Sequence, residues 1–465
     1  MKKTVIYTLT GIVSPALTLL LLPVYLNYLS TTDYVILALT NSFLAVFAIF
    51  FNLKTDQAYR TLFYYDLENK QKQKQLFQTI FSFQLMASFI WLGLFYVLGD
   101  WLFSLIFKND FSFYPYSWLL LATFLATNLC NLYFIHLQNT GKVKTYSRYF
   151  IALTLVTHLV QLSVIFILKL DFLWFLLSGL IVVLFFLGVI YIGNRLMFSF
   201  SFSKSIFREA LCFSLPFIPF LVLYNLENQL DRFFIERYLS LEELAGYAVL
   251  ISIISTILTF FNSVDNAVRP ELYQDLAEKK PEMRYSIQEK LDFYWLIGLL
   301  AFSFLLAFGT HIDWFLQHEK YNGIRTYFPW MTLAFLPVIG IRFWALQLVY
   351  EKQIGKINWF YFGKIILMTL LFIGLVPIYK IYGTIVTIAL SNLLNIMVFF
   401  MLTSVRVLPS RKVLFNTLFF IGLNSIILFV TDTNFISLIT LSQFLLFSLL
   451  FVNHYWVKIK SIIKS

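Results

Sequence analysis

The sequence predicts an all-α integral membrane protein with about fourteen transmembrane helices. Its 465 residues are 60% hydrophobic and 13% charged, with a mean hydropathy of +0.78. Soluble globular domains have about 45–50% apolar and about 25% charged residues. Apolar runs of about 20 residues, long enough to cross a bilayer as helices, recur along the chain. These runs lack the period-two alternation of barrel strands, so the spanning segments are expected to be helices.

The first expected helix follows Lys2-Lys3 and continues to Leu29. No small-residue cleavage site follows it, so it is interpreted as a retained helix and not as a signal peptide. The other expected helices are separated by short segments rich in charged residues, glycine or proline. The expected helices are 5–29, 34–53, 76–98, 116–138, 147–168, 172–193, 210–238, 243–266, 287–310, 327–350, 357–378, 382–404, 412–430 and 434–456.

The distribution of Lys and Arg predicts that both termini are cytoplasmic. With the N-terminus inside, 26 of the 35 basic residues fall in inside segments, 5 fall outside and four lie within helices. Cytoplasmic loops of membrane proteins carry such an excess of basic residues. The formal net charge of +11 therefore indicates membrane topology and not nucleic-acid binding.

Short motifs recur at similar topological positions about 210 residues apart. The triplet Tyr28–Ser30 ends the first helix and Tyr238–Ser240 ends the seventh. Five residues after the second helix match five after the eighth: Arg60, Tyr64, Asp66, Leu67 and Lys70 match Arg269, Tyr273, Asp275, Leu276 and Lys279. A Gly-Lys pair follows both the fourth and the tenth helix, as Gly141-Lys142 and Gly355-Lys356. An offset of six helices predicts two parallel lobes with the same orientation, and a substrate site between such lobes.

The expected domains follow from this repeat. Residues 1–200 form an N-terminal six-helix lobe, residues 201–406 a C-terminal six-helix lobe, and residues 407–465 two additional helices with a basic tail.

The seventh expected helix holds the densest set of intramembrane charges. Glu227 and Asp231 lie four residues apart and share one face, while Arg232 and Glu236 share another. These charges either form internal salt bridges, with Glu236 and Arg237 at the outer water boundary, or border a central cavity. In the second interpretation, Glu227 and Asp231 carry a coupling cation or proton.

Basic residues in or beside other helices are candidates for binding an anionic substrate. Arg342 and Lys364 lie in the inner halves of expected helices, where they either line a cavity or extend toward headgroups. Arg60 and Arg269 are repeat equivalents, and arginine binds phosphate through a planar bidentate fork. Arg232 completes the cationic candidates. Asp265, one turn inside Arg269, either pairs with that arginine or takes part in ion coupling.

Prolines interrupt the leading helix of each predicted lobe. They are candidate hinge or gate points, although kinks that serve packing alone are equally consistent with them. The four residues are Pro15, Pro23, Pro216 and Pro219. No phosphate-binding loop, metal cluster or nucleophile constellation is found, so we expect no cofactor, no metal and no catalytic residue.

The stretch Asn228–Tyr247 resembles the helix 7–8 signature of the polysaccharide biosynthesis transporters, which are Wzx-type flippases of O-antigen and capsule. These belong to the multidrug/oligosaccharidyl-lipid/polysaccharide exporter superfamily. Leu22–Tyr34 resembles the helix 1–2 stretch of the family, Arg60 its basic residue after helix 2, and Gly141-Lys142 its turn after helix 4.

Three positions depart from the family pattern. Asn27 replaces a frequent arginine, Val35 a frequent glycine, and Glu236 a small or basic residue. A phosphate site built on the first helix is therefore doubtful.

The resemblance implies a bacterial inner-membrane flippase that moves an undecaprenyl-pyrophosphate-linked oligosaccharide from the cytoplasmic to the periplasmic leaflet. Alternating access would drive this movement, coupled to an ion gradient. The implied partners are membrane lipids, a polysaccharide polymerase and a chain-length regulator, around a monomeric transporter. The alternatives are a small-molecule (multidrug) exporter of the same fold and, with less support from the short outside loops, a membrane O-antigen polymerase or ligase.

Overall fold

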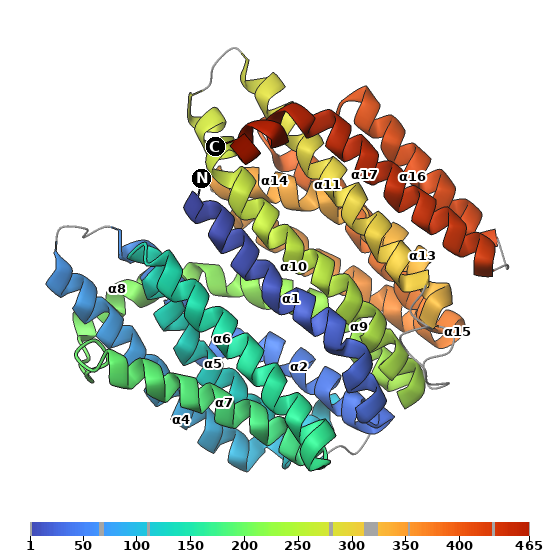
Figure 1. The fold of residues 1–465 in the computed structure, drawn as a ribbon. Helices are drawn as coiled ribbons and strands as arrows, with labels where there is room; N and C mark the ends of the chain where they lie inside the picture. The colour runs from blue at the N-terminus through green and yellow to red at the C-terminus, as the bar shows by residue number, and fades with distance from the viewer. Residues whose placement is uncertain are drawn as a thin grey trace. The chain divides into compact units, whose positions relative to one another are not determined.

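The protein is an assembly of α-helices, as seen in a computed structural model (Figure 1). The structure describes residues 2–64, 69–108, 112–278, 282–310, 324–351, 354–429 and 433–464. Within these residues there is no β-strand. In this described part of the chain, eleven helices are long and apolar enough to cross a membrane, and twelve when a bent pair is counted as one span. The chain is therefore a multi-pass α-helical membrane protein.

Two compact units divide the chain. The first comprises Met1–Ser14 and Tyr28–Leu241, and the second comprises Pro15–Asn27 and Glu242–Ser465. This division at residue 241 does not coincide with the lobe boundary expected at residue 200. Since compactness does not test a sequence repeat, the three-part division into lobes remains a prediction.

The first unit contains six long helices and several short ones. The long helices are α2 (Thr31–Asn52), α4 (Lys70–Ile106), α5 (Tyr116–Asn139), α6 (Val143–Ser163), which continues into the π-helix η1 (Val164–Leu168), α7 (Phe172–Gly193) and α9 (Ile218–Tyr238). The short elements are the first part of α1 (Lys2–Tyr28), α3 (Thr55–Leu62), α8 (Lys204–Ser214) and the 3₁₀ turn η2 (Leu215–Phe217). The α5 helix packs on α2, α4 and α7, while α9 packs on α2 and α8 on α3.

The second unit contains the segment Pro15–Asn27 of α1 and the remaining helices. They are α10 (Leu241–Glu278), α11 (Met283–Thr310), α13 (Ile324–Phe335), α14 (Val338–Tyr350), α15 (Ile354–Leu402), α16 (Arg411–Phe429) and α17 (Thr433–Lys464). Here α11 packs on α17, and α15 packs on both α13 and α14.

The repeated Tyr-Leu-Ser triplet acts as a helix terminator and cap. Ser30 Oγ accepts a hydrogen bond from the backbone N–H of Asp33 at 3.1 Å, and Asp33 Oδ2 accepts one from the Ser30 N–H at 3.2 Å. This reciprocal pair is a capping box at the start of α2. Ser240 and Glu243 have the same spacing before α10. The two junctions therefore share the residue pattern of a capping box, which the structure shows formed at Ser30 and Asp33.

Two breaks explain how the observed helices relate to the fourteen expected ones. The apolar segment Ile357–Leu402 is 46 residues long, about twice the ~20 residues that a bilayer requires. Lys380 has non-helical angles (φ 51°, ψ −131°) within it. A Cβ atom on Gly383 would lie 2.4 Å from the carbonyl oxygen of Leu375, so the backbone folds closely on itself at this point. Residue 380 thus separates two helices that were predicted as 357–378 and 382–404.

The second break joins α8 to α9, which meet at an angle of 55°. Pro216 lies in the intervening 3₁₀ turn, and Pro219 lies in the first turn of α9. A single helix was expected over 210–238, and the missing N–H group of proline explains the bend. The count of fourteen spans and the cytoplasmic position of both termini remain predictions.

Polar side chains connect the helices inside the first unit. Thr40 of α2 and Ser117 of α5 are both buried and hydrogen-bonded at 2.7 Å. Gln78 of α4 donates to the backbone carbonyl of Leu196 at 3.2 Å. Between membrane helices, such bonds contribute about 0.6 kcal/mol each on average. They position helices whose remaining contacts are van der Waals packing.

Candidate functional site

One ion pair of the second unit joins α14 to α10. Arg342 Nη2 is 2.8 Å from Asp265 Oδ2, and Arg342 Nη1 donates to the backbone carbonyl of Leu258 at 3.0 Å. Asn262 Oδ1 also accepts from Nη2. The guanidinium carbon lies 5.9 Å from the ring centroid of Phe261, in the range of a cation–π contact. We call these groups, with Tyr294, the Arg342 cluster.

Both carboxylate oxygens of Asp265 are used within this cluster. Tyr294 of α11 donates its hydroxyl to Oδ1 at 2.5 Å, while Oδ2 faces Arg342. Asp265 is only 8% exposed, so the pair is largely removed from water. The alternative that Asp265 pairs with Arg269 is not what the structure shows. The carboxylate turns to the guanidinium of α14, and Arg269 is exposed.

Lys364 lies in a separate enclosed position within the second unit. Its side chain is 3% exposed, and Nζ donates to Asn395 Oδ1 at 2.7 Å. The ammonium is also 4.3 Å from the ring centroid of Tyr361. Lys364 therefore does not extend toward headgroups. It connects the two halves of α15 and has a different set of partners from Arg342.

The charged row on α9 belongs to the first unit. Asp231 is 6% exposed, and its Oδ1 accepts from the backbone N–H of Arg232 at 2.8 Å. Arg232 donates to Gln229 Oε1 and to the carbonyl of Asn228 on its own helix, and does not pair with Glu236. The side chain of Glu227 is half-buried. The Arg232 side chain is therefore bonded within α9.

Glu236, which was expected at the outer water boundary, has an enclosed side chain at the end of α9. It is 1% exposed, and its Oε2 accepts from the backbone N–H of Lys108 at 3.0 Å. Lys108 Nζ also donates to the carbonyl of Arg237 at 3.4 Å. The carboxylate thus attaches the chain that follows α4 to the end of α9.

Arg60 is exposed on α3 and donates from Nη1 to Gln138 Oε1 of α5 at 2.9 Å. Its neighbour Tyr59 is fully buried and hydrogen-bonded to His136 Nδ1 at 2.7 Å. Burial raises the pKa of the Tyr59 phenol, so it stays protonated. The arginine can therefore face a ligand from water while the tyrosine fixes α3 against α5.

The proline candidates differ in what surrounds them. Pro23 is partly buried within α1, and Pro216 and Pro219 are exposed at the α8–α9 bend. Pro15 lies in the helical backbone of α1, but its side chain is outside the described residues. Pro216 and Pro219 thus lie at the bend between α8 and α9, and the hinge or gate role of the four prolines remains a prediction.

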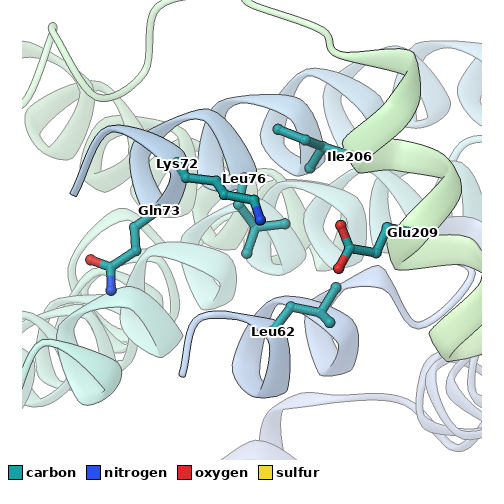
Figure 2. Close-up of a pocket in the computed structure, with 6 residues that line it drawn as sticks. All are labelled: Leu62, Lys72, Gln73, Leu76, Ile206 and Glu209. Carbon is teal, nitrogen blue, oxygen red and sulfur yellow. The ribbon is translucent and has the colours of Figure 1, made fainter. Parts of the chain in front are cut away.

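A shallow pocket opens on the first unit among α3, α4 and α8. Figure 2 shows its lining, with Lys72 and Glu209 on walls formed by α4 and α8 and Leu62 on α3. It holds about 290 Å³ of empty space, part of it open to solvent. Drug-sized ligands occupy roughly 300–1,000 Å³. This pocket is therefore too small for a glycan head group. In the described ranges, no group of three or more metal-ligating side chains occurs.

Sequence reasoning did not identify Tyr294, Asn262 and Asn395 as partners of the candidate charges. Each is a polar side chain on an apolar helix, a signal that was available. Their pairing could not be deduced because it depends on how helices distant in sequence pack together.

Comparisons with known proteins agree with this architecture. The family described as polysaccharide biosynthesis protein matches residues 27–322. No curated protein matches. Among solved structures, the lipid II flippase MurJ in an inward closed conformation has a TM-score of 0.60 and 13% identity, with 93% of this chain and 99% of that chain covered.

Two transporters of the MATE class are also similar. The eukaryotic MATE transporter AtDTX14 has a TM-score of 0.63 and 14% identity, covering 87% of this chain and 96% of its own. The MATE transporter ClbM in complex with Rb⁺ has a TM-score of 0.56 and 14% identity, covering 90% and 96%. At such identities the likeness establishes the fold. The chain belongs to the polysaccharide biosynthesis protein family, with the fold shared by the MurJ and MATE transporters.

Proposed function

We propose that the protein is a flippase for a lipid-linked oligosaccharide, carrying an undecaprenyl-pyrophosphate-linked repeat unit from the cytoplasmic to the periplasmic leaflet. The single observation that carries the proposal is the guanidinium of Arg342, which lies within a spanning segment and is bound to Asp265. A charge at this depth is costly unless it serves a ligand or a partner. The membership of the chain in a polysaccharide biosynthesis family supports a glycan cargo.

The Arg342 cluster suits an anionic head group because a pyrophosphate can replace the carboxylate. Arg342 already uses both terminal nitrogens as donors in a planar arrangement. The same fork binds phosphate oxygens in two parallel hydrogen bonds. Substrate binding would then release Asp265, whose charge must be met by a proton, a cation or Tyr294.

This exchange links substrate binding to ion coupling. Asp265 becomes the coupling group nearest to the head group, and Glu227 and Asp231 on α9 are further candidates in the first unit. Arg60, Arg269, Arg232 and Lys364 are the remaining candidate ligands for the head group. Arg60 and Arg269 are exposed and suit the first encounter, whereas Lys364 requires its enclosure to open.

Movement would follow alternating access between lobes at residues 1–200 and 201–406, with the last two helices beside the polyprenyl tail. Pro15, Pro23, Pro216 and Pro219 would serve as hinge or gate points. The protein would act as a monomer in a bacterial inner membrane. Its products would pass to a polysaccharide polymerase and a chain-length regulator, in O-antigen or capsule synthesis.

Reconstitution tests the proposal. Proteoliposomes with a fluorescent undecaprenyl-pyrophosphate oligosaccharide in the inner leaflet are mixed with a membrane-impermeant quencher. We expect time-dependent transfer to the outer leaflet, absent from liposomes without protein. A protein that is folded and inserted but transfers no labelled lipid would contradict the proposal.

A small-molecule exporter is the second candidate function, because the MATE transporter AtDTX14 matches with a TM-score of 0.63. We expect an exporter of cationic drugs to have an acidic or apolar cavity. The positive charge of the Arg342 guanidinium would repel a cationic drug. Efflux of a cationic dye from the same proteoliposomes separates the two functions. Dye efflux without lipid transfer would favour the exporter.

A further inference from the structure

The shallow pocket of the first unit has charged side chains of opposite sign on two of its walls. Figure 2 shows Lys72 of α4 and Glu209 of α8 extending toward each other. The rest of the lining is largely apolar and includes Leu62, Leu76 and Ile206. Among the described residues, no ion pair joins the two charged side chains to each other. Both can therefore contact one ligand that carries a positive and a negative charge.

Contacts between helices hold the two charged walls in place. The α8 helix packs on both α3 and α4, and its Ala210 is fully buried in the hydrophobic cluster beneath. At the start of α8, the backbone N–H of Ser203 donates to Thr79 Oγ1 of α4 at 3.2 Å. Thr79 lies seven residues after Lys72, which is two helical turns along the same face of α4. The bond therefore connects α8 to the face of α4 that carries Lys72.

The pocket lies where the membrane-spanning part of α4 begins. Residues 70–75 are six polar residues, alternately lysine and glutamine, and the apolar run of the helix starts at Leu76. On α8, Lys204 and Arg208 are exposed, whereas Ala210 is buried. Lysine and arginine at the ends of spanning helices place their charges at the interface between hydrocarbon and water. The pocket is therefore at the level of lipid head groups.

Exposed aromatic side chains lie further along α4 on the apolar side of the pocket. The segment that precedes α8 runs beside α4, where the N–H of Ser201 donates to Ser82 Oγ at 3.3 Å. Ser82 is ten residues after Lys72, or about 15 Å along the helix. Phe200 and Phe202 of this segment are 64% and 46% exposed. This part of the first unit thus offers polar contacts to a head group and apolar contacts to acyl chains, which favours a phospholipid over a soluble ligand.

The two opposite charges select among phospholipid head groups. Lysine binds phosphate as a point charge, and a carboxylate accepts hydrogen bonds from an ammonium group. An ethanolamine head group carries a phosphate and a primary ammonium on a short carbon bridge, so it can contact Lys72 and Glu209 together. A choline head group has no N–H to donate, and a glycerol head group has no cation to face the carboxylate.

We propose that Lys72 and Glu209 form a binding site for phosphatidylethanolamine, with the phosphate at Lys72 and the ammonium at Glu209. The acyl chains of this lipid lie beside Phe200 and Phe202. The bound lipid is a component of the surrounding membrane and not the transported cargo. The site is separate from the Arg342 cluster, and the proposal does not depend on which substrate is transported.

The test measures lipid binding to the full chain, purified in detergent and delipidated, by native mass spectrometry. Three dioleoyl lipids with the same acyl chains and different head groups are compared: phosphatidylethanolamine, phosphatidylcholine and phosphatidylglycerol. We expect phosphatidylethanolamine to bind about fivefold more tightly than either of the others, because one charge-assisted contact in a partly exposed site has about this effect.

Two substitutions of Glu209 should change the lipid preference in different ways. Glu209→Gln removes the negative charge and should lose most of the preference for phosphatidylethanolamine. Glu209→Lys places a second cation in the pocket and should make phosphatidylglycerol the preferred lipid. The Glu209 side chain is exposed, so neither substitution removes a buried contact. Lys72→Gln should weaken binding of both phosphatidylethanolamine and phosphatidylglycerol, because their phosphate contact is lost.

Two control variants remove charges that do not line the pocket. Arg208→Gln changes an exposed neighbour of Glu209 on α8, and Glu271→Gln changes an exposed carboxylate on α10 in the second unit. Both should keep the lipid preference of the wild type. A preference lost equally in Arg208→Gln and Glu209→Gln would show that the pocket does not determine it.

Two further results would overturn the proposal. One is equal binding of the three lipids by the wild type, and the other is an unchanged preference in Glu209→Gln. Soluble glycerophosphoethanolamine serves as a competitor without acyl chains, and displacement of the lipid at equal concentration would contradict a lipid ligand. Since the assay contains no lipid-linked glycan, failure here leaves the flippase proposal untouched. Failure of glycan-lipid transfer likewise leaves the phosphatidylethanolamine site intact.

Discussion

At the residue scale, the intramembrane charges are held by partners that the sequence could not assign. Arg342 and Asp265 are 77 residues apart and meet only because α10 and α14 pack together. The sequence singled out both residues as candidates, since charges in spanning helices are costly. The sequence alone does not say whether Asp265 pairs with Arg269 or with Arg342. Both are arginines with the same charge, one a single turn away on the same helix and the other on a helix distant in sequence.

The Arg342 pair predicts a defined pattern of stability. Arg342→Gln leaves a buried carboxylate facing Tyr294 alone and should destabilise the protein by about 3–5 kcal/mol. Adding Asp265→Asn removes that charge and should recover most of the loss, as measured by thermal unfolding in detergent. A double variant no more stable than Arg342→Gln would show that the pair is not the source of the effect.

The same double variant distinguishes a structural role of Arg342 from a role in lipid transport. If Arg342 binds the head group, lipid transfer stays lost in Arg342→Gln with Asp265→Asn, although stability returns. Transfer at the wild-type rate in the double variant would assign Arg342 a purely structural role.

The enclosure of Lys364 predicts low chemical accessibility. In a chain with Cys130 and Cys212 replaced by Ala, Lys364→Cys should react with a membrane-impermeant thiol reagent roughly tenfold or more slowly than Arg60→Cys, because exposure controls the reaction. Rapid labelling at position 364 that substrate suppresses would instead place this residue in an open cavity.

At the element scale, the spans expected from hydropathy correspond to helices, and the differences lie at helix ends and breaks. Hydropathy counts apolar residues and does not register backbone conformation. It therefore placed one helix over 210–238, where the chain bends by 55° near Pro216. It also missed α3, whose eight residues are too few and too polar to span.

Lys380 predicts a measurable strain between the two halves of α15. Its angles (φ 51°, ψ −131°) suit glycine and not lysine. Lys380→Gly removes this strain but also removes the partly exposed ion pair between Lys380 and Glu243 at 3.0 Å. The net effect should be a stabilisation of the protein by about 1 kcal/mol. Thermal unfolding measures the change. Lys169→Gly is the matched control, since Lys169 is left-handed in an ordinary helix-end conformation (φ 50°, ψ 41°) and should gain less. Destabilisation by Lys380→Gly would contradict this interpretation.

At the scale of the whole molecule, composition was sufficient to predict a polytopic α-helical membrane protein, and the structure confirms it. The family resemblance was carried by short motifs such as Asn228–Tyr247, which lies inside the matched range 27–322. The arrangement of the polar clusters was beyond sequence reasoning because it arises from packing between helices.

The distribution of basic residues predicts an orientation that labelling can test. In intact cells, Lys169→Cys should react with an impermeant thiol reagent, and Lys3→Cys should react only after permeabilisation. Both variants are made in the background without Cys130 and Cys212. Labelling of Lys3→Cys in intact cells would contradict a cytoplasmic N-terminus.

On the proposed function, the protein transports a glycan by binding the anionic group that links the glycan to its lipid. The most direct test compares two fluorescent donors in the same proteoliposomes, one with a pyrophosphate link and one with a neutral link to the same glycan and tail. We expect the pyrophosphate donor to be transferred roughly tenfold faster or more, because only this donor can form the bidentate contact with Arg342. Equal transfer of both donors would contradict it.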